Sequence, residues 1–328
     1  MSKLTPSLAA LAITLVPVLH AAPAHATLNN RSWVSTLNGN DANTCVITAP
    51  CQTFQRAHDQ TVAGGTVSVL NAGSYGTLAI SKAINITNDG SGEAGISSGV
   101  SVGIDVTAGS GDIISLRGLV IDGLGSIDGI GIEFFSGSAL HIQNCVIRNF
   151  AGGNNGAGIV FLPSGNSQLF VSDTIIFNNG ANSGANGGIN IVPATHGTAN
   201  VVLDRVQMEN NVNGLVVNGQ FATGVGAHVI LRDSVISANV GNGVWSLTSG
   251  GHAPAFVLVE RSSLVNNSQN GILANGPGAT VLLKESTITR NGAGVSTVNS
   301  GQLISYGTNT NNNNIGAEGT ATSFLSAF

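Results

Sequence analysis

Residues 229–239 read VILRDSVISAN, and this run of alternating aliphatic residues, an acid and an asparagine six positions later decides the fold. The acid and asparagine recur as Asp173 with Asn179, Asp204 with Asn210, Asp233 with Asn239, Glu260 with Asn266, and Glu285 with Asn291. The acid returns after 31, 29, 27 and 25 residues. A repeat of this length is typical of a solenoid in which each repeat forms one coil.

Aliphatic residues occupy fixed places around the acid, including two earlier copies in which Gly118 and Asn144 replace it. Two positions before it stand Leu116, Ile142, Val171, Val202, Leu231, Leu258 and Leu283. The residues four before it are apolar except Asn200, and those two after it, such as Ile175, are expected to continue the buried column. This period of two predicts strands with one buried face.

A glycine followed by an aliphatic residue closes each copy. These pairs begin at Gly131, Gly158, Gly188, Gly214, Gly243, Gly271 and Gly294. Each copy thus supplies about three short strands, and coils stack ~4.8 Å apart so that like residues lie above like residues. The residue after each pair should point outward, and this column reads Glu133, Val160, Asn190, Val216, Trp245, Leu273 and Ser296.

These patterns resemble the right-handed parallel β-helix of the pectin-lyase-like superfamily. The resemblance covers residues 66–316 and about nine or ten coils, and it implies that the asparagines form a structural amide ladder at a tight turn. Residues 33–65, with Trp33, Cys45 and Phe54, also resemble the N-terminal region of secreted bacterial β-helix proteins of uncharacterised function. The fold expectation is therefore specific, whereas no reaction is implied.

The start of the chain is typical of an export signal. Residues 1–26 contain Lys3, a short apolar run and the small-residue site Ala24-His25-Ala26, and that run is shorter than the ~20 residues of a membrane span. We expect a secreted or periplasmic protein without a membrane span. Without Lys3 the net charge is −6, and charged residues make up only 8% of the chain, so nucleic acid is not expected as a partner.

Residues 27–65 are expected to form an N-terminal cap. A short amphipathic helix from Thr53 to Val62 should cover the exposed sheet edge, and residues 317–328 should form a C-terminal tail. Cys45 and Cys51 are close in sequence, and export favours a disulfide between them. Cys145 should pack as a small apolar residue inside a coil.

Two kinds of catalytic site can be weighed against the family pattern. Glycoside hydrolases of this fold usually carry Gly-His-Gly and Arg-x-Lys signatures, and the sequence contains neither. A lyase needs a basic residue beside carboxylates, and one stretch is dense enough in such groups: Arg117, Asp122, Asp128, Glu133, His141 and Arg148. Stacked acids at the repeat position could hold calcium in such an enzyme, but a structural role at a bend explains them as well.

A binding surface is the alternative that the outward column favours. Four of its seven residues are apolar or aromatic, and Trp245 could stack on a sugar ring. With Asn190 and Glu133 it forms the candidate ligand site, unless the loops at 218–227 and 247–254 cover it. We therefore expect an exported, non-catalytic scaffold that binds a glycan or a cell-surface protein, without cofactor or metal. The alternative is a lyase or hydrolase acting on an acidic glycan, with calcium under the lyase alternative alone.

Overall fold

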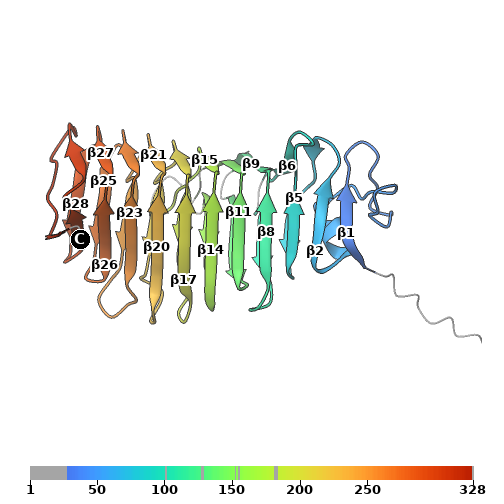
Figure 1. The fold of residues 1–328 in the computed structure, drawn as a ribbon, viewed down its shortest axis with the longest axis horizontal. Coiled ribbons are helices and arrows are strands. Elements are labelled where there is room, and N and C mark those ends of the chain that lie inside the picture. The colour runs from blue at the N-terminus through green and yellow to red at the C-terminus, as the bar shows by residue number, and fades with distance from the viewer. Residues whose placement is uncertain are drawn as a thin grey trace, which may run out of the picture.

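The protein is a long parallel β-helix whose coils succeed one another along one axis (Figure 1). A computed structural model describes residues 28–99, 102–126, 129–151, 153, 156–180 and 184–326. The expected signal peptide and Asp128 lie outside these ranges. Within them, each complete coil adds one strand to each of three sheets, and all strand pairs are parallel. The predicted fold class is confirmed, and the nine strands of the third sheet mark about nine coils.

The three sheets are named here in the order in which each coil visits them. In the described residues, sheet 1 has 12 strands: β1 (Asn29–Val34), β2 (Thr61–Val69), β5 (Ile84–Thr87), β8 (Ile113–Arg117), β11 (Ala139–Gln143), β14 (Asn166–Ser172), β17 (Thr198–Asp204), β20 (Gly226–Arg232), β23 (Ala255–Glu260), β26 (Ala279–Lys284), β29 (Gln302–Tyr306) and β31 (Ser323–Leu325). Sheet 2 has ten described strands: β3 (Gly73–Ser74), β6 (Ala94–Ser97), β9 (Leu119–Ser126), β12 (Val146–Phe150), β15 (Ile175–Phe177), β18 (Gln207–Glu209), β21 (Val235–Ser237), β24 (Ser263–Val265), β27 (Thr287–Thr289) and β30 (Thr310–Asn312). Sheet 3 has nine described strands: β4 (Leu78–Ile80), β7 (Ile104–Thr107), β10 (Ile130–Ser136), β13 (Ala157–Phe161), β16 (Ile189–Ile191), β19 (Leu215–Asn218), β22 (Val244–Leu247), β25 (Asn270–Asn275) and β28 (Ala293–Val298).

The corner between sheets 1 and 2 is made by one residue in the left-handed conformation. Its φ is 51° at Asp173, 53° at Arg205 and 51° at Asp233. This residue interrupts the alternation of inward and outward side chains, because its left-handed backbone is not extended as in a strand. The expectation that the residue two after the acid is buried is therefore wrong for Ile175 and Val235, which are each 38% exposed on the outer face of sheet 2. It holds for Val206 and Ser262, which are at most 3% exposed.

The acid does not mark the same position in every coil. Asp204 and Glu260 are the last residues of their strands, and the basic residues after them, Arg205 and Arg261, make the corner. The sequence prediction placed Val202 and Leu258 in the core, but this shift turns them outward. The inner column is instead Leu116, Ile142, Val171, Leu203, Leu231, Val259 and Leu283. These residues are at most 3% exposed and form part of one continuous core.

The corner between sheets 2 and 3 holds the asparagine ladder. The buried members in successive coils are Asn179, Asn211, Asn239, Asn267 and Asn291, followed by the half-buried Asn314. From Asn211 onward, each Oδ1 accepts the backbone N–H of the ladder asparagine in the preceding coil, over 2.9–3.2 Å. The sequence repeat predicted Asn210 and Asn266 here. Those two residues instead adopt left-handed φ values of 53° and 58° one position earlier, because their coils carry the one-residue shift.

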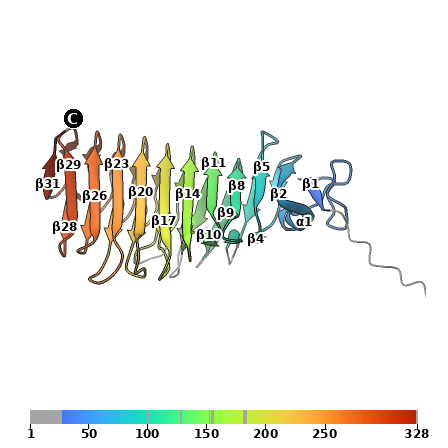
Figure 2. The same cartoon turned by 60° about the horizontal axis from the view of Figure 1, so that its bottom comes forward.

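A short helix lies at the N-terminal end (Figure 2), and a disulfide ties the same cap. Helix α1 (Phe54–Asp59) is shorter than the expected range, because Thr61 already begins β2. It buries Phe54 against the Tyr75 ring, with 4.9 Å between ring centroids, and packs on β1, β2 and β4. The Cys45–Cys51 disulfide is present, with 4.7 Å between the Cα atoms. Cys145 is free and buried in a coil, as expected.

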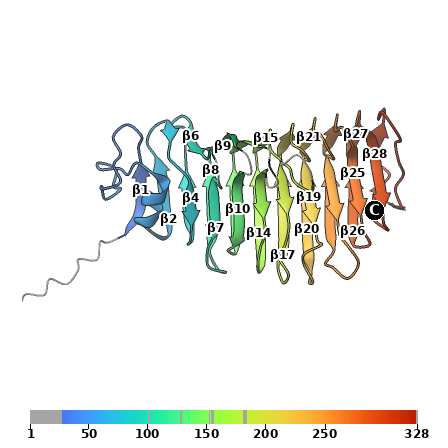
Figure 3. The ribbon, with the colours of Figure 1, turned by 180° about the vertical axis from the view of Figure 1, so that it is seen from behind.

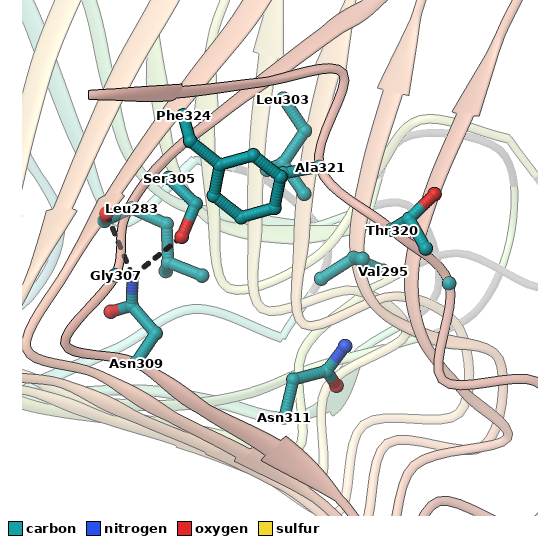
Figure 4. A pocket seen from close by; sticks show the side chains of 11 residues that line it. Leu283, Val295, Leu303, Ser305, Gly307, Asn309, Asn311, Thr320, Ala321 and Phe324 are labelled. Carbon is teal, nitrogen blue, oxygen red and sulfur yellow. Dashed lines mark hydrogen bonds between the residues drawn. The ribbon is translucent and has the colours of Figure 1, made fainter.

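The C-terminal end is covered by residues that the sequence analysis expects as a tail. β31 lies in this segment and pairs parallel to β29. Figure 4 shows Phe324 beside Leu303 and Ala321 at the rim of a hollow of about 290 Å³. Asn309 Nδ2 donates to the Leu283 carbonyl over 2.9 Å and to Ser305 Oγ over 3.0 Å. This hollow is the end of the coil stack, closed by a thin cover.

The described part of the chain contains no helix with the length and hydrophobicity of a membrane span.

Candidate functional site

The outward column predicted from the glycine pairs lies in register on sheet 3. Several strands of this sheet, from β4 to β28, are labelled in Figure 3. Strand pairing places Asp105, Glu133, Val160, Asn190, Val216, Trp245, Leu273 and Ser296 one above another, and we call this file the lateral strip. The glycine column lies against the asparagine ladder: a Cβ on Gly271 would approach Asn291 Nδ2 to 2.9 Å. Only glycine lets the backbone pass this close, which explains why the glycine pair fixes the strip so reliably.

Exposure varies along the lateral strip. Its middle is covered, since Asn190 is 3% and Val216 0% exposed, whereas Glu133, Val160, Trp245 and Leu273 are partly accessible. The cover includes residues 184–186, and the carbonyls of Gly184 and Asn186 accept hydrogen bonds from Asn213 Nδ2. Of the two loops considered from the sequence, 218–227 contributes Asn218 and Phe221 beside the strip. No pattern in the sequence predicts this position of residues 184–186, because their placement depends on a contact with the next coil.

The first of two hollows on the strip centres on Glu133 and Asn190. It has a volume of about 380 Å³ and includes Val160 and the 60% exposed ring of Phe221. Burial raises the pKa of the Glu133 carboxyl, and the neighbouring charge of Asp105 raises it further. Asn190 Nδ2 makes a long, 3.5 Å contact with Asn186 Oδ1, while Asn190 Oδ1 is buried without a partner among the described residues. This hollow therefore combines a carboxyl group and an unsatisfied amide oxygen with an exposed aromatic ring.

The second hollow centres on Trp245. It has a volume of about 300 Å³ and includes Asn213, Asn242, Gln269 and Leu273. Asn242 Nδ2 donates to Asn213 Oδ1 over 3.3 Å, so these two amides already satisfy one another in part. Trp245 Nε1 is buried without a partner among the described residues. A buried polar atom without a partner costs roughly 1–3 kcal/mol, and both such atoms on sheet 3 lie beside hollows on the strip.

The residues weighed as catalytic do not converge on one place. Arg117 ends β8 on sheet 1 and pairs with Asp89, whereas Glu133 lies on sheet 3. Among the candidates that the structure describes, only Asp122 and Arg148 meet, on sheet 2, with 2.7 Å between Oδ2 and Nε. Asn149, also on sheet 2, joins this pair, because its Nδ2 donates to Asp122 Oδ1 over 2.9 Å.

The electrostatics of Asp122 agree with a satisfied ion pair. Burial alone would raise the pKa of this carboxyl, but hydrogen bonds from Asn149, the Leu124 amide and Arg148 outweigh burial and hold it below its usual range. His141 lies elsewhere, on sheet 1, with its ring stacked on Phe170 at 4.7 Å between centroids. The stretch that looked dense in sequence is thus spread over three sheets.

The repeat acids do not form a stack of carboxylates either. They occupy two adjacent rows in which acids and bases alternate: a first row of Asp204, Arg232, Glu260 and Lys284, and a second row of Asp173, Arg205, Asp233, Arg261 and Glu285. Ion pairs join the coils, such as Arg205 Nε to Asp173 Oδ1 at 2.7 Å and Lys284 Nζ to Glu260 Oε1 at 2.8 Å. The described residues contain no group of three or more potential metal ligands.

The comparisons with known proteins agree with this architecture. The protein is a parallel β-helix, and residues 82–280 match the family described as "Right handed beta helix region"; the chain belongs to that family. Pectate lyase Pel9A is similar over 84% of this chain and 79% of its own, with a TM-score of 0.56 and 14% identity. At this identity the likeness shows the fold alone.

Two further solved structures are more distant. A GH136 lacto-N-biosidase from Eubacterium ramulus has a TM-score of 0.47 and 11% identity, covering 90% of this chain and 67% of its own. The A-module of the mannuronan C-5 epimerase AlgE4 of Azotobacter vinelandii has a TM-score of 0.45 and 15% identity, covering 81% and 91%. No curated protein matches the sequence.

Proposed function

We propose that the protein is an exported, non-catalytic β-helix scaffold that binds a glycan along the lateral strip. The observation that carries this proposal is the pair of buried, unpartnered polar atoms, Asn190 Oδ1 and Trp245 Nε1, each beside a hollow with both apolar and polar side chains in its walls. An amide oxygen accepts and an indole N–H donates, so together they match the hydroxyl groups of a sugar chain. Exposed and half-exposed rings, Phe221 and Trp245, supply the apolar faces on which sugar rings stack.

The geometry favours an extended ligand that runs along the β-helix axis. Asn190 and Trp245 lie two coils apart in the strip, which corresponds to ~9.6 Å at the spacing of parallel strands. Glu133 lies two coils beyond Asn190 on the other side. Because Asp105 and Glu133 are acidic, this end of the strip repels uronates and suits a neutral glycan, whose hydroxyls can also donate to the Glu133 carboxyl.

Binding is tested by screening the protein without residues 1–26 on a glycan array and measuring the affinity of the best ligand by calorimetry. Trp245→Ala should weaken binding by about 2 kcal/mol, or roughly 30-fold, as expected for a central aromatic contact. Ile175→Ala is the matched control, since Ile175 is partly exposed on the outer face of sheet 2. Equal affinity of the Trp245 variant and the control would refute glycan binding at this strip.

One observation supports hydrolysis as a second candidate function. Asp105 and Glu133 are direct neighbours in register, and the raised pKa of Glu133 is what a general acid requires. Under this alternative, Glu133→Gln should abolish release of reducing sugar from the bound glycan while leaving its affinity within about twofold. Unchanged glycan after prolonged incubation with the unmodified protein would leave binding alone as the function of the strip.

A further inference from the structure

The outer face of sheet 1 carries a long apolar row that the sequence prediction missed. Strand pairing aligns Phe170, Val202, Ile230, Leu258, Leu282 and Ile304 in six consecutive coils. All six are partly or largely accessible, and Ile230 is 38% exposed. Figure 1 looks onto this sheet, and no described segment of the chain crosses the row. A contiguous apolar stripe of this kind marks an interaction surface, because the outer face of a solvated sheet is ordinarily polar.

The first charged row runs beside the apolar row, two residues further along each strand. From β17 to β26 it reads Asp204, Arg232, Glu260 and Lys284, so the charges alternate along the axis. When this row of four is read in the opposite direction, the charge at every position has the opposite sign. Two copies packed face to face with their long axes antiparallel would therefore place an acid opposite a base at every coil.

We propose that a second copy of this chain covers the face, related by a two-fold axis that runs parallel to the strands between β20 and β23. This axis keeps each row opposite itself and reverses the order of its coils. Arg232 then faces Glu260 of the second copy, and Asp204 faces Lys284. The apolar row has the same centre, since three of its six members lie on each side of the axis.

The shape of the face fits this arrangement. A hollow of about 320 Å³ lies around Val202, between the larger side chains of Phe170, Ile230 and Phe256. The proposed axis brings Leu282 of the second copy over Val202. The larger leucine side chain therefore meets the hollow that the smaller valine leaves in the row. At the centre, Ile230 meets Leu258, which are similar in volume.

The size of the face is sufficient for a stable dimer. Six strands at ~4.8 Å span ~29 Å, and the seven residues of β17 at ~3.3 Å span ~23 Å. The face thus measures about 670 Å² per copy and about 1,300 Å² for the pair, above the ~1,000 Å² of a specific interface. This inference does not depend on the proposed glycan site, which lies on sheet 3.

A charge swap tests both the dimer and its register. Sedimentation equilibrium of the protein without residues 1–26 should give twice the chain mass. Arg232→Glu would place glutamate opposite glutamate at two symmetric positions, and should weaken association by about 100-fold or more. Adding Glu260→Arg restores opposite charges across the axis, although it breaks further pairs within each chain. The double variant should therefore regain the dimer. If these charges act only within one chain, the double variant should instead be less stable than the single variant and should not regain the dimer.

A substitution in the apolar row provides the second measurement. Ile230→Asp should give a monomer, while Val235→Asp, at the same 38% exposure on sheet 2, should remain a dimer. Circular dichroism should show the same β-sheet spectrum for both variants. A monomeric parent protein at about 100 μM, well above the micromolar range of weak specific pairs, would overturn the proposal and assign the face to a different partner. Failure of the double charge variant to dimerise would overturn the antiparallel register.

Discussion

Replacing Asn211 with alanine removes a complete set of ladder contacts from the interior of the stack. Its Nδ2 donates to the Ile176 carbonyl over 3.0 Å, and its Oδ1 accepts from both the backbone N and the Nδ2 of Asn179 over 3.0 Å. The side chain is fully buried, so water cannot replace these contacts in the folded protein. Three net hydrogen bonds at about 1 kcal/mol each, with the added cost of orphaned groups, predict a loss of about 3–5 kcal/mol in the free energy of unfolding.

The adjacent Asn210 is the matched control. It is exposed, and its contribution is a left-handed φ of 53°, which alanine adopts at a cost of roughly 1 kcal/mol. Asn210→Gly should cost less than Asn210→Ala, since glycine tolerates this conformation. Urea unfolding followed by far-UV circular dichroism gives all three values. Equal losses for Asn210→Ala and Asn211→Ala, or a larger loss at Asn210, would refute the assignment of Asn211 to the ladder.

Three further outcomes follow from single sites. Cys45→Ser with Cys51→Ser should lower the free energy of unfolding by about 2.4 kcal/mol, the chain-entropy value for so short a loop, which urea titration against the parent protein with its disulfide intact measures. Burial raises the pKa of the Cys145 thiol to about 11, so it should react with Ellman's reagent at pH 8 only in denaturant, and labelling of the native protein would contradict its burial. The folded pKa of Glu133 lies above its unfolded value, so the stability that protonation provides is present at acid pH and is lost as the pH rises through the folded pKa. Glu133→Gln should therefore raise the melting temperature at pH 7 and change it little at pH 3, and a constant difference across this range would contradict a raised pKa.

The fold could be predicted because every coil repeats one pattern, and some positions of this pattern accept only one type of residue. The column that begins at Gly131 fixed the lateral strip in every coil, since a side chain there would strike the ladder or the next coil's backbone. Glu133, Asn190 and Trp245 consequently lie in the file that the sequence predicted. Their partial cover could not be predicted, because it depends on how residues 184–186 contact Asn213 in the next coil.

The acid was a poorer anchor, and the reason is electrostatic. Carboxylates stacked at ~4.8 Å repel each other, and alternation with arginine or lysine removes that repulsion. The chain achieves the alternation by moving the acid one position back in two coils, so that Asp204 lies beneath Arg232 rather than beneath Asp233. A pattern search that aligns the acids therefore assigns Val202 and Leu258 to the wrong face, and the apolar row on sheet 1 disappears from view.

The two proposed surfaces can act together because they lie on different sheets. The first charged row and the apolar row belong to sheet 1, whereas Glu133, Asn190 and Trp245 belong to sheet 3. A dimer formed through sheet 1 leaves both lateral strips accessible and orients them in opposite directions along the common axis. Two strips that bind one long glycan, or glycans on one surface, gain avidity from the second contact without any new interaction. Ile230→Asp should therefore weaken retention on an immobilised glycan while leaving the affinity for a short soluble one unchanged, and equal effects on both would show that the two faces are coupled.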